Sequence, residues 1–165
     1  MKVGFDNIYD HVIPFNDFKL NWRFNDSAYN RLPQIHLDQL KPLDKDASQF
    51  LWNFISETRL HSDMPFKKGF FKAVDHVRIT EENNSEIKKW LYKRGIPFKH
   101  NVFLSWQPDT ALIVSWKLLI KYFDDFHYSD DLTVIDESLN WALLFFHEGD
   151  IFFGSNDRFI PGNFR

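Results

Sequence analysis

Residues 47–55 carry apolar side chains at the spacing of an α-helix. The apolar positions recur at i, i+3, i+4, i+7 and i+8 and are Ala47, Phe50, Leu51, Phe54 and Ile55. Asp44 precedes them at a position where its carboxylate can cap the first turn. Because one apolar stripe needs a partner surface, the pattern predicts a helix that packs on a sheet.

Two further segments have helical signals. In residues 80–94, Ile87, Trp90 and Leu91 share one face, the last turn is basic, and Gly95 provides a stop. The next helix is expected to begin after Ser115 as its cap and to end near Asp124 and Asp125. Two carboxylates at a helix C-terminus oppose the helix dipole, which we interpret as a modest indication of function.

The rest of the chain favours strands. The segments with strand composition are 102–106, 110–114, 132–135, 141–146 and 151–154. The last two should form a hairpin, because Gly149 lies between them and can supply the positive φ of a tight turn. With no repeated βαβ rhythm, linker or repeat, the sequence predicts a single α+β domain, residues 1–165, with a mainly antiparallel sheet and about three packed helices.

The core of this domain should be aromatic. The chain has 19 Phe, 6 Trp and 5 Tyr among 165 residues, and each buried ring removes about 150 to 250 Å² from water. The absence of Cys excludes disulfides and thiolate metal sites. The first residues show no export signal, and no apolar run approaches the ~18 residues of a membrane span. We therefore expect a cytoplasmic protein without a membrane partner.

The formal net charge of −3 conceals two oppositely charged regions. Residues 67–99 contain nine Lys and Arg against four acids. Residues 122–157 contain no Lys or Arg, and their nine acids are Asp124, Asp125, Asp130, Asp131, Asp136, Glu137, Glu148, Asp150 and Asp157. A patch of one sign attracts a basic partner or a cation and repels nucleic acid.

A framework of aromatic and acidic residues between Trp116 and Gly154 carries a family resemblance. Its members are Trp116, Lys117, Tyr122, Phe123, Asp124, Asp125, Phe126, Ser129, Asp130, Asp131, Trp141, Phe146, His147, Glu148, Gly149, Phe152, Phe153 and Gly154. This framework resembles the C-terminal half of bacterial polymorphic-toxin immunity proteins, of contact-dependent inhibition or related effector systems. It also resembles an uncharacterised bacterial domain family. The first resemblance implies a protein that binds and neutralises a cognate toxin without catalysis.

Many such toxins are nucleases with basic clefts, so an acidic surface can plug the cleft by mimicking nucleic acid. The expected partner is therefore a basic toxin domain, and nucleic acid is not expected as a partner. The residues expected at the interface are Asp124, Asp125, Tyr128, Asp130, Asp131, Glu137, Glu148 and Asp150. Tyr128 and Trp141 are candidate aromatic anchors, although core packing is the favoured interpretation for Trp141 and an equal alternative for Tyr128.

Catalytic motifs are absent from the sequence. His147 and Glu148 lack the second His of a zinc-protease helix, and no glycine loop or nucleophile elbow is present. His127 beside the neighbouring aspartates is a weak candidate for a hard-cation site. We expect no enzyme, no cofactor and no metal, and keep a small hydrolase as an alternative.

A nucleic-acid-binding module is the other alternative. Residues 66–72 interleave Phe with Lys in the manner of a base-stacking platform, within a basic segment that extends to residue 99. The competing interpretation is a strand whose Phe side chains enter the core while its lysines stay in water.

Overall fold

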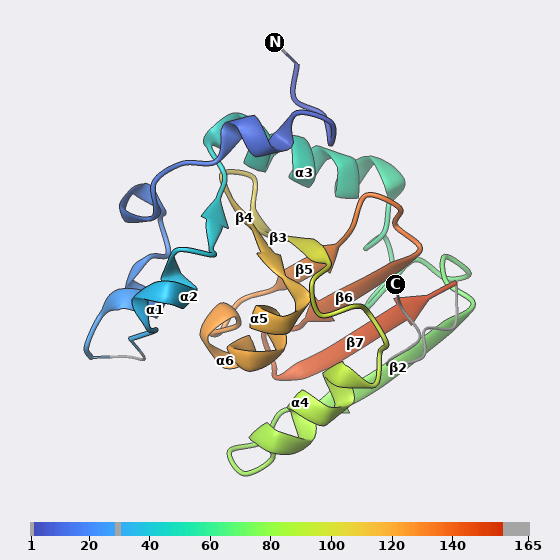
Figure 1. Cartoon of the computed structure of the whole chain (residues 1–165). Coiled ribbons are helices and arrows are strands. Elements are labelled where there is room, and N and C mark those ends of the chain that lie inside the picture. Colours follow the sequence, from blue (N-terminus) through green and yellow to red (C-terminus); the bar gives the residue numbers. More distant parts are fainter. Residues whose placement is uncertain (1, 29–30, 157–165) are drawn as a thin grey trace.

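A seven-stranded antiparallel sheet forms the centre of the computed structural model, which describes residues 2–28 and 31–156 (Figure 1). The strand order is β1-β4-β3-β5-β6-β7-β2. The strands are β1 (Lys41–Pro42), β2 (Ala73–Arg78), β3 (Asn101–Gln107), β4 (Thr110–Ser115), β5 (Leu132–Ile135), β6 (Trp141–Phe145) and β7 (Asp150–Ser155). The predicted α+β fold, the antiparallel sheet and the hairpin of β6 and β7 are confirmed.

Helices cover both faces of the sheet, with α3 and α4 on opposite sides (Figure 1). The described residues form six α-helices, α1 (Trp22–Asn25), α2 (Gln34–Leu37), α3 (Lys45–Thr58), α4 (Asn84–Tyr92), α5 (Trp116–Lys121) and α6 (Phe123–Phe126). Two 3₁₀ helices, η1 (Ile8–His11) and η2 (Phe15–Asp17), precede them. The expectation of about three helices was too low, because α1, α2 and α6 have four residues each and are too short to show helical periodicity.

Helix α3 follows its sequence pattern closely. The Asp44 carboxylate accepts a hydrogen bond from the Ala47 N–H at 2.9 Å, so the predicted cap is confirmed. Leu51 and Ile55 are buried against the sheet in one core cluster with residues of β3, β4, β5 and β6. At 14 residues this helix is shorter than the roughly 20 that a membrane span needs, and none of the described helices is long and apolar enough to cross a membrane.

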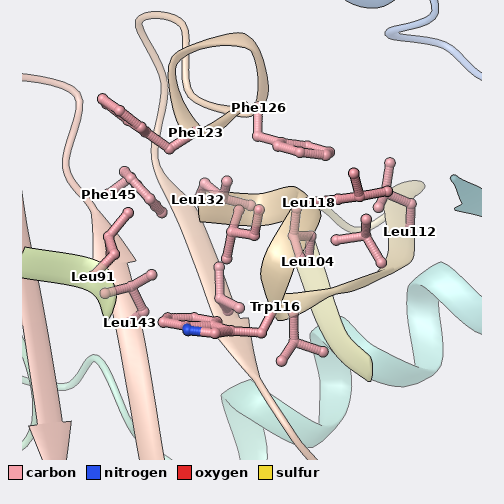
Figure 2. Packing of buried hydrophobic residues seen from close by; sticks show 14 of the residues in the cluster. Leu91, Leu104, Leu112, Trp116, Leu118, Phe123, Phe126, Leu132, Leu143 and Phe145 are labelled. Atoms are coloured by element: carbon pink, nitrogen blue, oxygen red, sulfur yellow. The ribbon is translucent and has the colours of Figure 1, made fainter. Parts of the chain in front are cut away.

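The larger core lies on the other face, where α4, α5 and α6 pack on the sheet (Figure 2). Figure 2 shows Trp116 of α5 and Phe123 and Phe126 of α6 turned toward side chains of the strands. Trp141 is only 1% exposed, and its ring lies 5.7 Å from that of Trp116. Trp141 is therefore a core residue, which confirms the favoured interpretation, and it is not an interface anchor.

The helix predicted after Ser115 is divided in two. Ser115 caps α5 by accepting from the Leu118 N–H at 3.3 Å, but α5 ends at Lys121 and a separate α6 follows. Asp124 and Asp125 consequently lie in the first turn of α6, a place where carboxylates are common, and not at a helix C-terminus. Their helix position therefore does not indicate function.

The basic segment was also interpreted incorrectly in part. Strand β2 at the sheet edge was not predicted, because most of its side chains are exposed and show no apolar alternation. Residues 66–72 precede it without forming a strand. Phe66 and Phe71 are buried, with their rings 5.1 Å apart. These two rings are core residues and are not available to stack on bases.

Candidate protein-binding site

Several acidic segments lie at one end of the sheet, where β2 and β6 end and β5 and β7 begin. Antiparallel pairing sets Arg78 at the end of β2 opposite Asp150 at the start of β7, and Leu132 opposite Phe145. The Ile79 N–H donates to the Gly149 carbonyl at 2.8 Å, which joins the loop after β2 to the β6–β7 turn. In Figure 1 the start of β7, α6 and the loop before α4 lie at this same end.

Side-chain contacts hold the acidic segments together. Asn84 at the start of α4 donates to the Asp124 carboxylate of α6 at 3.1 Å. Asp131 accepts from the backbone N–H of His147 at 2.9 Å, and the His147 ring Nδ1 lies 2.9 Å from the same oxygen. We name this surface the acidic end and define it by the carboxylates of Glu81, Glu82, Asp124, Asp125, Asp131 and Glu148. All of them are exposed except Asp125, which is half-buried.

Two predicted interface residues at this end, Asp130 and Asp150, form ion pairs with other residues of the chain. Asp130 lies 2.8 Å from the Arg23 guanidinium, which is itself 7% exposed. Asp150 pairs with His76 at 2.8 Å and with Arg78 at 3.2 Å. Hydrogen bonding to His76, followed by the Arg78 charge, lowers the pKa of the Asp150 carboxyl. These two carboxylates contribute to structure first, and less of their charge is available to a partner.

Tyr128 keeps its place as a candidate contact. Its side chain is 52% exposed beside the acidic end. The ring meets that of Trp22 edge-on at 5.5 Å, and the Arg23 guanidinium lies 5.5 Å from its centroid. An exposed ring held by such contacts loses little freedom on binding, as expected of an anchor.

Glu137 does not join the acidic end. It lies in the turn between β5 and β6, at the far end of β5 from Asp131. The neighbouring Asp136 in that turn accepts hydrogen bonds from Trp141 at 2.9 Å and Ser138 and lies 3.0 Å from His100. Burial alone would raise the pKa of Asp136, but these hydrogen bonds outweigh it and lower the pKa to about 2. Glu137 is therefore separated from the other predicted interface residues by the length of β5, because it lies in the turn of the β5–β6 hairpin.

The cation site considered around His127 has little support. The His127 side chain is 7% exposed, and burial lowers its pKa. Asp130 faces Arg23, and within residues 2–28 and 31–156 no group of three His, Asp or Glu side chains is placed to hold a metal ion. His147 and Glu148 lie in the β6–β7 turn, as expected. Asp157 lies outside the described residues.

A pocket of about 750 Å³ opens beside the acidic end. It lies between the C-terminal part of α3, the segment 61–65 and the sheet, and Asp130 and Asp131 contribute to its lining. Ser105 of β3 and Thr133 of β5 are directly opposite each other, and Leu144 of β6 is opposite Thr133. These three side chains form one row across the sheet and the floor of the pocket.

His61 covers one side of this floor. Its Nδ1 lies 2.8 Å from the Pro65 carbonyl oxygen, which can only accept, so Nδ1 carries the proton. Its Nε2 lies 2.9 Å from the Thr133 hydroxyl and therefore accepts from it in the neutral ring. Burial lowers the pKa of His61, which keeps the ring neutral at neutral pH.

The sequence reasoning missed the pocket residues, together with Glu81 and Glu82. Ser105 and Thr133 had one local signal, because each is a polar residue within an otherwise apolar strand. Glu81 and Glu82 were assigned to the basic segment, and only the return of β2 beside β7 brings them to the acidic end.

Comparisons with known proteins identify no family. No family model matches the chain, and neither the curated proteins nor the solved structures gave a match.

Proposed function

We propose that this protein is an immunity-type inhibitor that binds and neutralises a basic bacterial toxin domain without catalysis. The observation that supports it is the acidic end, where segments distant in the sequence bring six carboxylates together from the β2–α4 loop, α6, the loop before β5 and the β6–β7 turn. No Lys or Arg occurs in residues 122–157, which supply four of these six.

An inhibitor of this kind works by charge and shape. A concentrated negative potential attracts a basic cleft and raises the rate of association, while contact with the cleft excludes its substrate. Toxins that act on nucleic acid have such clefts because they bind phosphate backbones. The acidic end therefore suits a nuclease toxin as partner, in the bacterial cytoplasm where its substrate lies.

A small hydrolase is the second candidate. The Thr133 hydroxyl lies 2.9 Å from the accepting Nε2 of His61 in the pocket, and a base in this position can activate a hydroxyl. Turnover of a peptide or ester substrate that vanished in Thr133→Val would favour the hydrolase over the inhibitor.

The experiment needs a candidate toxin, and any effector C-terminal domain found encoded next to the gene of this protein is the first to be tested. We expect cells that express this toxin domain to survive only when they also express the inhibitor, and the two purified proteins to form a complex. Expression of an unrelated acidic protein is the control. Death of the co-expressing cells, with no complex between the purified proteins, would refute the proposal.

A further inference from the structure

The pocket beside the acidic end has the properties of a receptor for one kind of side chain. We infer that it binds the guanidinium group of an arginine. The inference rests on the proposed function, since the arginine would belong to the toxin bound at the acidic end. It adds a specific contact to an interface otherwise defined by charge.

Hydrogen-bond acceptors without a full set of partners lie around the pocket. Ser105 is 4% exposed, and its hydroxyl has no partner among the described residues. The Asp130 Oδ1 atom is likewise buried and unpaired there. The Asp131 Oδ1 atom accepts hydrogen bonds from His147, whereas Oδ2 accepts none from the described residues. A guanidinium has five donors and no acceptor, which complements such a set.

The walls are suited to a flat cation. Trp52 and Phe146 line the pocket with aliphatic side chains of α3 and β6, whereas Trp106, which also contributes to the lining, has its ring in the larger core and donates to the Phe126 carbonyl at 3.1 Å. Aromatic faces attract cations, and a guanidinium also stacks on them through its plane. A lysine ammonium is compact and strongly hydrated, so it gains less from the same walls.

The balance of charge in the lining is negative. Among the described residues of the lining, Arg59 at the end of α3 is the one Lys or Arg, whereas Asp63, Asp130 and Asp131 supply three carboxylates, one of them shared with Arg23. The neutral His61 ring adds no positive charge at neutral pH. A cation is therefore favoured over an anion, although Arg59 offers an anion one contact.

The test uses N-acetyl-L-arginine methylamide as the probe, without any toxin. The assigned indole N–H signals of Trp52 and Trp106 are followed by NMR during titration. The matched comparators are the methylamides of N-acetylcitrulline, which has nearly the same shape without the charge, and of N-acetyl-lysine. We expect saturation by the arginine probe and roughly tenfold weaker binding of both comparators.

Variants separate the pocket from the rest of the acidic end. Ser105→Ala and Asp131→Asn should each weaken the arginine probe roughly fivefold or more, because each removes one acceptor. Glu148→Gln removes the same charge as Asp131→Asn, lies outside the pocket lining, and should change binding less than about twofold. Ser105→Ala should fold normally, since the hydroxyl it removes has no partner among residues 2–28 and 31–156.

Three results would overturn the inference. The first is equal binding of the arginine and citrulline probes, and the second is tighter binding of N-acetylglutamate methylamide through Arg59. The third is unchanged binding of the arginine probe to Ser105→Ala and Asp131→Asn. Its failure is distinguishable from failure of the proposed function. Neutralisation of the toxin by Ser105→Ala as efficiently as by the parent would refute only the arginine pocket. Binding of the probe in a protein that neutralises no toxin would leave the pocket and refute the inhibitor.

Discussion

The two ends of strand β5 use carboxylates in different ways. At the β5–β6 turn, Asp136 is half-buried and is held by Trp141, Ser138 and His100. At the acidic end, Asp131 and Glu148 are exposed, and Glu148 has no hydrogen bond to any described residue. The comparison teaches that a run of acids in a sequence mixes carboxylates held by hydrogen bonds within the fold with carboxylates exposed at its surface, and only the latter are candidates for binding a partner.

Asp130 and Asp131 are adjacent in the chain but differ in the same way, since Asp130 is held within the fold and Asp131 is exposed. Asp130→Asn should destabilise the protein by about 2–3 kcal/mol, because it leaves the buried Arg23 guanidinium without its counter-charge. Asp131→Asn should cost less than about 0.5 kcal/mol, since the side chains of Asp131 and of its hydrogen-bond partner His147 are both about half exposed. Urea unfolding of the two variants measures the difference. Equal destabilisation would break the distinction between the two carboxylates.

Asp136→Asn should produce a smaller loss of about 1–2 kcal/mol. The lowering of the Asp136 pKa to about 2 means that its charged form stabilises the fold. The expected loss is reduced to this range because solvent partly screens the carboxylate. The sign follows from the lowered pKa: this contribution is complete above the usual carboxyl pKa of about 4 and is lost as the pH falls toward 2. Urea unfolding of parent and variant between pH 6 and pH 2.5 checks this. A difference that stayed constant across that range would contradict it.

The smallest expected effect on stability belongs to the acidic end itself. Asp124→Asn, Asp131→Asn and Glu148→Gln combined should change the free energy of unfolding by less than about 1 kcal/mol, because all three side chains are exposed. The matched control combines Asp10→Asn, Asp46→Asn and Glu137→Gln, three exposed acids on segments outside the acidic end. Thermal unfolding of both variants should resemble that of the parent. A loss of several kcal/mol in the first triple would show that the acidic end is structural.

Much of the fold was predictable because the signals are local. The stripe of α3, its Asp44 cap and the Gly149 turn are each encoded within a few residues, and the structure has all three. The edge strand β2 was missed because its partner β7 lies some 75 residues later and its exposed side chains leave no pattern. Pairing at that distance is not written in local periodicity.

The candidate site was predictable only in part. The acids of residues 124–150 were visible as a charge run, but the sequence did not show that Asp130 faces Arg23, 107 residues away. Nor did it show that Glu137 lies at the opposite end of β5. The pocket depends on Ser105 and Thr133 meeting across two strands under His61, a contact that joins residues 72 apart. Such a site is made by tertiary structure.

The central claim is that the acidic end binds the basic partner, and the association rate tests it most directly. Stopped-flow association with a toxin domain that the protein neutralises in co-expressing cells should be on the order of tenfold slower for the Asp124→Asn, Asp131→Asn, Glu148→Gln variant than for the parent at low salt. The Asp10→Asn, Asp46→Asn, Glu137→Gln control, which has the same net charge, should associate nearly as fast as the parent. High salt should reduce the difference between the variants, because exposed charges are screened beyond about 8 Å at physiological ionic strength. Equal slowing of the two variants would show that only net charge matters and would contradict the account.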